Sequence, residues 1–158
     1  MKNIIEKVIY FLLVLTWMIV IFKFSNEPAE VSGNTSLNVT RVIVELVENK
    51  ETPEEQRIEK INQLDPIIRK IAHFALFAIG GFIIMLFINT YDTKQNKKII
   101  ISVIIGIIYA CTDEIHQIFI PGRSGQITDV IIDSFGIIVG TYISLLIINV
   151  LNKIIKKR

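Results

Sequence analysis

Two histidines and several carboxylates recur at helical spacing, and they are the residues of this chain best suited to chemistry. Asp113 precedes His116 by three positions, and Asp129 precedes Asp133 by four, so each pair shares one face of a helix. A carboxylate can orient an imidazole as a general base, and the two groups together can bind a metal ion. We therefore consider His73, Asp113, His116 and Asp133 candidate catalytic residues, and metal binding stays an open alternative.

Further polar residues close to these are candidates for ligand binding. They are Lys70, Glu114, Gln117, Arg123 and Asp129. Arg123 lies in a Pro-Gly turn, from which a guanidinium can clamp a phosphate or a carboxylate. Each has a structural alternative: Arg123 could anchor its loop, Asp129 could cap a helix, and Lys70 could extend to the membrane interface. The Asp113–His116 pair could likewise lock helices together.

Four long apolar stretches must position these side chains. The chain has 158 residues, 51% of them hydrophobic, and a mean hydropathy of +0.53, which is unlike a soluble domain of this length. About 20 apolar residues in a helix span a bilayer, and the stretches that reach this length are 4–24, 71–90, 99–120 and 130–151. We predict an all-α, multi-pass protein of the cell membrane with four transmembrane helices in one domain, residues 1–158. A soluble nucleotide-binding fold is excluded, and the single cysteine, Cys111, excludes an intramolecular disulfide framework.

Basic residues are unevenly shared between the two sides of the predicted bundle. The segments before the first span, between the second and third, and after the fourth carry nine Lys or Arg residues, including Lys2, Lys157 and Arg158. Residues 25–70 carry six basic and nine acidic residues. Because basic loops stay in the cytoplasm, we expect both termini to be cytoplasmic and residues 25–70 to form an extracytoplasmic segment. The net charge of +2 does not indicate a nucleic-acid partner.

The extracytoplasmic segment contains signals for short amphipathic helices. Thr52-Pro53-Glu54-Glu55 reads as an N-cap, a proline at the first helical position and a glutamate at the third, which starts a helix. Asp65-Pro66 is predicted to end it, because proline lacks the backbone N–H. Apolar residues at helical spacing across 39–47 indicate a second helix. Both helices are expected to lie on the membrane or on the bundle.

The ionisable residues of the last three spans gather at the outer end of the predicted bundle. Each lies within about three helical turns of the outer surface, at about 1.5 Å per residue. A Pro-Gly turn makes the third and fourth spans antiparallel neighbours. We therefore predict an outward-facing polar pocket walled by three helices, with Arg123 over it. Its four carboxylates outnumber the cations Lys70 and Arg123, so the pocket would raise the pKa of a carboxylate or recruit a cation.

At these residues the chain resembles the VanZ-like family of small bacterial membrane proteins. The blocks that carry the resemblance are Phe24-Ser25-Asn26 with Pro28, Ser32 and Ser36; Arg69-Lys70-Ile71-Ala72-His73-Phe74; and Thr112-Asp113-Glu114-Ile115-His116-Gln117, continuing through Phe119, Pro121-Gly122-Arg123, Ser124, Asp129 and Asp133 to Gly136. The last block is the longest and the most specific. The resemblance covers roughly residues 10–145. It implies a link to low-level resistance to teicoplanin-type glycopeptide antibiotics, for which the family is named.

Two functions are open from the sequence. The first is a binding module whose outer pocket holds the headgroup of a membrane lipid or a lipid-linked cell-wall precursor; by the resemblance, it would lower glycopeptide susceptibility. The second is a membrane-embedded hydrolase or transferase acting on a lipid-linked substrate at the outer leaflet. There, Asp113 would orient His116 as the general base, and Asp133 and His73 would supply an acid or metal ligands. Transport is disfavoured for a monomer of four short spans, although a homo-oligomer would reopen it.

Overall fold

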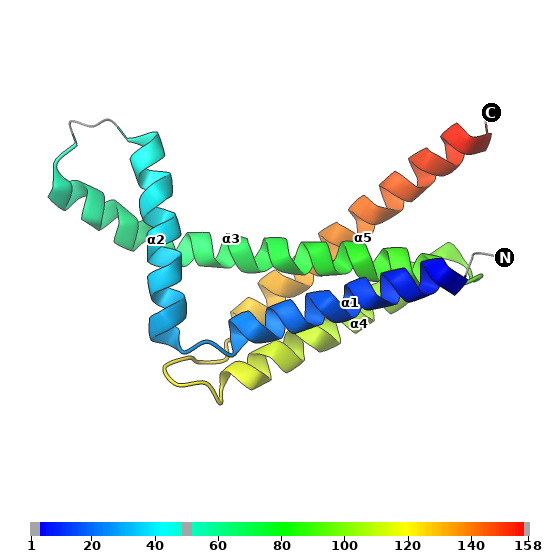
Figure 1. Ribbon diagram of the computed structural model, residues 1–158, viewed down its shortest axis with the longest axis horizontal. Coiled ribbons are helices and arrows are strands. Elements are labelled where there is room, and N and C mark those ends of the chain that lie inside the picture. The colour runs from blue at the N-terminus through cyan, green and yellow to red at the C-terminus, as the bar shows by residue number, and fades with distance from the viewer. Residues whose placement is uncertain (1–3, 49–51, 157–158) are drawn as a thin grey trace.

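Five helices make up the described part of the chain. The structure, a computed structural model, describes residues 4–48 and 52–156 (Figure 1). Its helices are α1 (Ile4–Ser25), α2 (Ala29–Val47), α3 (Glu54–Asn89), α4 (Gln95–Gln117) and α5 (Ile127–Lys156). All of these except α2 are long and apolar enough to cross a membrane. The prediction of an all-α chain with four helices able to span a bilayer is therefore confirmed. Three of the basic residues used to predict the orientation, Lys2, Lys157 and Arg158, lie outside the described residues.

The long helices pack as a bundle with alternating directions. Helices α1, α3 and α4 contact one another, and α5 crosses them at an angle while packing on α3 and α4 (Figure 1). The first residues of α1, the turn between α3 and α4, and the last turns of α5 lie toward one end of the bundle. Helix α2 and the loop between α4 and α5 lie toward the other end. The cytoplasmic location of the termini stays a prediction.

Close packing of α5 on α3 depends on two glycines. A Cβ atom at Gly136 would collide with the carbonyl oxygen of Phe74, and one at Gly140 would collide with that of Ala78. The two backbones therefore approach as in other helix pairs joined by small residues. Gly136 and Gly140, one turn apart on α5, thus form the close contact with α3. Asp133, one turn before Gly136, is held beside α3 by the same contact.

An aromatic cluster joins α1 to α3 and α4. The indole Nε1 of Trp17 donates a hydrogen bond to the carbonyl oxygen of Leu76 at 2.9 Å, and the Tyr109 hydroxyl donates one to that of Met18 at 2.6 Å. The rings of Trp17 and Phe77 meet edge to face with their centroids 5.8 Å apart. Polar groups inside a bilayer have no water to bind, so these bonds hold α1 firmly against its neighbours.

The prediction that Asp65-Pro66 ends a helix is wrong. Helix α3 runs without interruption through Pro66 and includes the whole second predicted span. The prediction of its start is corrected as well, because the N-cap is Pro53, not Thr52, and no side chain caps the helix there. The segment predicted to lie outside the membrane thus contains α2 and the first turns of α3, not two separate short helices.

Contacts with α2 explain why α3 continues through a proline. Proline inside a helix costs about 3 kcal/mol, because it removes one hydrogen bond and clashes with the preceding turn. The hydroxyls of Ser36 and Thr40 on α2 both donate to Oδ1 of Asp65, next to the proline. Figure 1 shows α3 bending where it passes α2. Docking of α2 on this turn offsets the cost of Pro66, and the predicted amphipathic helix across 39–47 is confirmed as part of α2.

Candidate functional site

A cavity of about 300 Å³ opens where α3 and α5 meet the end of α4 and the loop that follows it. We call it the polar cavity. Six of the nine predicted site residues line it: Lys70, His73, Gln117, Arg123, Asp129 and Asp133. The other three, Asp113, Glu114 and His116, are not among its lining residues. The six lining residues can contact a ligand in the cavity directly, whereas the other three support the wall of the cavity.

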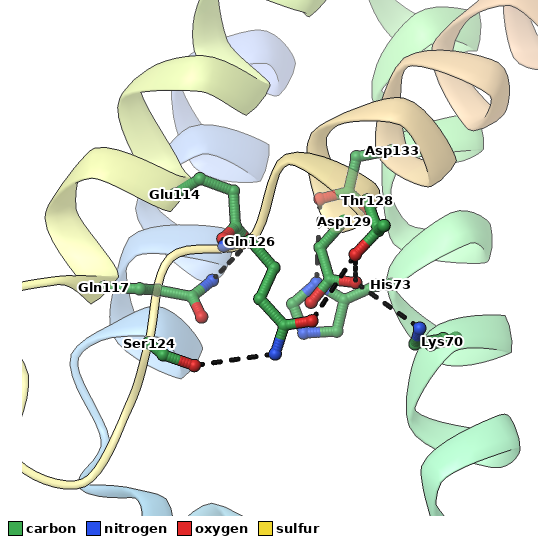
Figure 2. A network of polar contacts seen from close by, with 9 residues as sticks. All are labelled: Lys70, His73, Glu114, Gln117, Ser124, Gln126, Thr128, Asp129 and Asp133. Atoms are coloured by element: carbon green, nitrogen blue, oxygen red, sulfur yellow. Dashed lines mark hydrogen bonds and ion pairs between the residues drawn. The ribbon is translucent and has the colours of Figure 1, made fainter.

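His73, Asp113 and Asp133 form a cluster where α3, α4 and α5 meet. Each offers one ligand atom, and these atoms lie within 4.8 Å of one another. Nδ1 of His73 lies 3.8 Å from Oδ2 of Asp133, from opposite helices (Figure 2). Asp133 is fully buried, and neither carboxylate oxygen has a hydrogen-bond partner in the described part of the chain. A charged carboxylate buried in this way is costly unless a cation accompanies it.

His116 lies apart from this cluster, although it is only three residues from Asp113. Its ring stacks on Phe22 of α1, with the ring centroids 4.7 Å apart. Its Nε2 is buried and has no hydrogen-bond partner among the residues that the structure describes. Three residues on an α-helix differ in direction by about 60°, which is enough to point Asp113 toward α5 and His116 toward α1. The expected Asp113–His116 pair is therefore replaced by the grouping of Asp113 with His73, and a catalytic role for His116 stays a prediction.

Gln117 and Glu114 connect the cluster to the loop after α4. The Gln117 amide Nε2 donates to Oδ2 of Asp113 at 3.0 Å and to Oε1 of Glu114 at 3.1 Å. The backbone N–H of Gln126 donates to Oε2 of Glu114 at 2.9 Å. Glu114 thus faces the loop that leads into α5, and its carboxylate is occupied by contacts within the chain (Figure 2).

Lys70 and Asp129 form an ion pair at the rim of the polar cavity. Nζ of Lys70 lies 3.8 Å from Oδ1 of Asp129, and the two side chains are 50% and 30% exposed. Exposed pairs of this kind contribute little to stability, about 0–1 kcal/mol. Asp129 lies within the first turn of α5, so it is not the N-cap of that helix. The pair links α3 to the start of α5 and can open to a ligand at small energetic cost.

Arg123 anchors the loop between α4 and α5 to the end of α1. Its Nε donates to the carbonyl oxygen of Glu27 at 2.9 Å, and its Nη2 donates to that of Phe24 at 2.9 Å. The loop-anchor alternative is supported, and Arg123 also lines the polar cavity. Burial and the positive charge of Arg69 lower the pKa of Arg123. An anion between these two guanidinium groups would relieve their repulsion.

Arg69 is a candidate site residue that was not among those predicted from the sequence. It lines the polar cavity and also a second cavity of about 240 Å³, between α2, α3 and the end of α1, which we call the apolar groove. Its Nη2 lies 3.5 Å from the hydroxyl of Ser32 on α2. Arg69 and His73 are four residues apart on one face of α3, and this spacing was the signal that could have found it.

One family model matches most of the sequence, from residue 10 to residue 149, and it is described as VanZ/LLP1. The chain belongs to the VanZ/LLP1 family. In this VanZ/LLP1 protein, residues of the second and third blocks line the polar cavity, and Phe24, Ser32 and Ser36 of the first block line the adjoining apolar groove. Ser32 on α2 meets Arg69 on α3, and the long third block spans the end of α4, the loop and the start of α5. Comparisons with curated proteins and with solved structures found no significant match.

Proposed function

We propose that this VanZ/LLP1 protein binds a membrane lipid with an anionic headgroup. The headgroup would occupy the polar cavity, and an acyl chain would lie in the apolar groove. The observation that carries the proposal is that Arg69, His73 and Arg123 line both spaces. A polar site and an apolar groove that share a basic wall fit a molecule with a charged head and an apolar tail.

The charges of the polar cavity favour an anion at this shared wall. Two carboxylates of the cavity already have contacts, Asp129 with Lys70 and Asp65 with hydroxyls of α2, and Asp133 faces His73 and not an arginine. In the described part of the chain, neither Arg69 nor Arg123 forms an ion pair with a carboxylate. A phosphate beside these guanidinium groups would accept charge-assisted hydrogen bonds, which are about twice as strong as neutral ones.

The apolar groove is suited to a hydrocarbon chain. Its lining is mainly apolar or small, and its apolar members are Phe24, Val39, Ile68, Ala72 and Leu76. It lies between α2, the end of α1 and the part of α3 where the apolar span begins, which would place it at the depth where a lipid headgroup meets its chains. The uneven distribution of basic residues supports placing this end of the bundle at the outer leaflet.

A lipid-linked cell-wall precursor combines the same two features, a phosphate-bearing headgroup and a long apolar chain. We include it among the lipids that the site would bind at the outer leaflet. Binding there would withhold the precursor from a glycopeptide antibiotic and so lower teicoplanin susceptibility, which is the role that the family resemblance implies for this chain.

A second candidate function is a membrane-embedded hydrolase or transferase acting on the same class of lipid. The cluster of His73, Asp113 and Asp133 favours it, because His73 lines the cavity in which Arg69 would hold the phosphate. An imidazole oriented by a carboxylate can activate water as a general base. Incubation of the protein with a radiolabelled lipid distinguishes the two functions, because turnover yields a separable product and binding alone does not.

Binding of lipids with matched chains tests the primary proposal. The purified protein in detergent is titrated with fluorescent phosphatidylglycerol and with phosphatidylcholine of the same chain length. We expect the anionic lipid to bind at least about tenfold more tightly, since charge-assisted hydrogen bonds contribute about 1.5–3 kcal/mol. Arg69→Gln should abolish this preference, whereas Lys97→Gln, at the other end of the bundle, should leave it unchanged. Equal affinity for the two lipids in the unsubstituted protein would refute the proposal.

A further inference from the structure

The cluster of His73, Asp113 and Asp133 has the composition of a metal site. It offers one imidazole nitrogen and two carboxylate oxygens, all within 4.8 Å of one another. The three residues come from α3, α4 and α5, so helix packing holds them in place. Ligand atoms that each lie about 2.1 Å from one tetrahedral ion are about 3.4 Å apart. Side-chain rotations that shorten the separations by up to about 1.4 Å would therefore bring all three atoms onto one ion.

Unpartnered buried atoms in the cluster favour the binding of a cation. Asp133 is 0% exposed, and among the residues that the structure describes neither of its carboxylate oxygens has a hydrogen-bond partner. Nδ1 of His73 is buried and has no hydrogen-bond partner within residues 4–48 and 52–156, although it lies only 3.8 Å from Oδ2 of Asp133. The other cations that line the cavity contact other groups: Lys70 contacts Asp129, Arg69 contacts the Ser32 hydroxyl, and Arg123 contacts backbone carbonyls. Burial of two carboxylates is favourable only with compensating positive charge, and a divalent ion supplies it.

Gln117 holds the Asp113 carboxylate by a hydrogen bond, as neighbouring residues commonly do for the ligands of a metal ion. Its Nε2 donates to Oδ2 of Asp113 and is buried with it. The same nitrogen donates to Glu114, whose second oxygen accepts the backbone N–H of Gln126. Outer contacts of this kind orient a ligating carboxylate and typically raise metal affinity about 10–100-fold. The direction of the Asp113 carboxylate is thus fixed before an ion arrives.

We propose that His73, Asp113 and Asp133 bind one divalent transition-metal ion, with Zn²⁺ and Mn²⁺ as the ions that suit this ligand set. An imidazole nitrogen favours these ions over Mg²⁺ or Ca²⁺, which prefer oxygen ligands alone. His73 and Asp133 also line the polar cavity, so a water molecule or a phosphate oxygen can complete the coordination from that side. The inference is independent of the proposed lipid binding, because the ion needs no lipid to bind.

Metal content measures the site directly. The full chain is purified in detergent, stripped with a chelator, loaded with Zn²⁺ or Mn²⁺, and desalted before elemental analysis and calorimetric titration. We expect about one ion per chain in the unsubstituted protein. His73→Ala and Asp133→Asn should each weaken binding by more than the about 10–100-fold that loss of an outer contact causes. His116→Ala is the matched control, since His116 stacks on Phe22 and should leave the metal content unchanged.

A substitute variant is needed in case Asp133→Asn does not fold, and two outcomes would overturn the proposal. If Asp133→Asn fails to fold, Gln117→Ala replaces it, because Gln117 touches the ligand Asp113 and would not touch the ion. This variant should fold and bind Zn²⁺ about 10–100-fold more weakly. Failure of the unsubstituted protein to retain either ion would overturn the proposal and indicate a proton shared between the carboxylates instead. Equal binding by the unsubstituted protein and Asp133→Asn would overturn it as well.

Discussion

His73 and Asp133 face each other across the contact between α3 and α5, with Nδ1 of the imidazole 3.8 Å from Oδ2 of the carboxylate. The two residues are 60 positions apart in the sequence, so only the packing of the two helices brings them together. That packing rests on Gly136 and Gly140, which let the backbones touch. The candidate site therefore depends on the contact between α3 and α5, and a substitution that separates the two helices should also move His73 away from Asp133.

Substitution of Gly140 tests this dependence. Gly140→Leu should separate α5 from α3 and lower the free energy of unfolding by at least the about 1–3 kcal/mol typical of overpacking, because a Cβ atom there collides with the carbonyl of Ala78. Gly33→Ala is the control, since a Cβ atom at Gly33 meets nothing within 4 Å. Thermal unfolding in detergent measures the effect. Unchanged stability in Gly140→Leu would mean that the two helices do not meet as described.

Substitution of Arg123 should lower the stability of the protein more than substitution of Arg69. Arg123→Gln removes hydrogen bonds to the carbonyls of Phe24 and Glu27, so it should lower the free energy of unfolding by about 1–3 kcal/mol as well as weaken anionic-lipid binding. Arg69→Gln should weaken lipid binding with little change in stability, because in the described part of the chain the Arg69 guanidinium makes one long hydrogen bond, to Ser32. Unfolding and lipid titration on both variants check this, and equal stability losses would contradict it.

The membrane orientation of the bundle can be tested with single cysteines. In a Cys111→Ser background, Ser124→Cys in the loop before α5 should react with a membrane-impermeant maleimide in intact cells. Asp92→Cys in the turn between α3 and α4 should react only after permeabilisation, because the basic segments predict that this end is cytoplasmic. Both positions are exposed, so burial does not confound the comparison. The reverse pattern would place the polar cavity at the inner leaflet.

The two histidines provide a matched pair for a cellular test. Teicoplanin susceptibility is compared in a susceptible Gram-positive host that expresses the unsubstituted protein, His73→Ala or His116→Ala at equal membrane abundance. We expect protection by the unsubstituted protein and by His116→Ala, and none by His73→Ala, because only His73 lines the polar cavity. Loss of protection in His116→Ala alone would reverse the assignment of the two histidines. No protection by the unsubstituted protein would contradict the proposed role in glycopeptide susceptibility.

The four helices long and apolar enough to cross a membrane could be predicted from the sequence, because local properties decide them. Length and hydropathy alone require that long apolar stretches cross the bilayer as helices. The path of the chain through Pro66 could not be predicted in the same way, since proline opposes a helix locally and the contacts of Asp65 with α2 decide the outcome. Tertiary contacts outweighed the local preference at this point.

The incorrect prediction that the helix ends at Pro66 also left part of the candidate site unrecognised. Asp65, Arg69 and His73 lie four residues apart along one face of α3, and all three line the polar cavity. The pattern is visible only when the helix is continued through Pro66. The sequence could not show whether His73 or His116 lies beside Asp113. That depends on which neighbouring helix packs against each face of α4, and helix packing is not a local property of the sequence.

Photo-crosslinking with lipid probes tests the central claim most directly. An anionic lipid carries a diazirine either in its headgroup or in its acyl chain, and the modified peptides are mapped by mass spectrometry. We expect the headgroup probe to label residues of the polar cavity, such as Lys70 and Gln126, and the chain probe to label the apolar groove at Val39 and Ile68. Labelling spread over the outer faces of α1 and α5, or equal labelling by a choline lipid, would contradict this expectation.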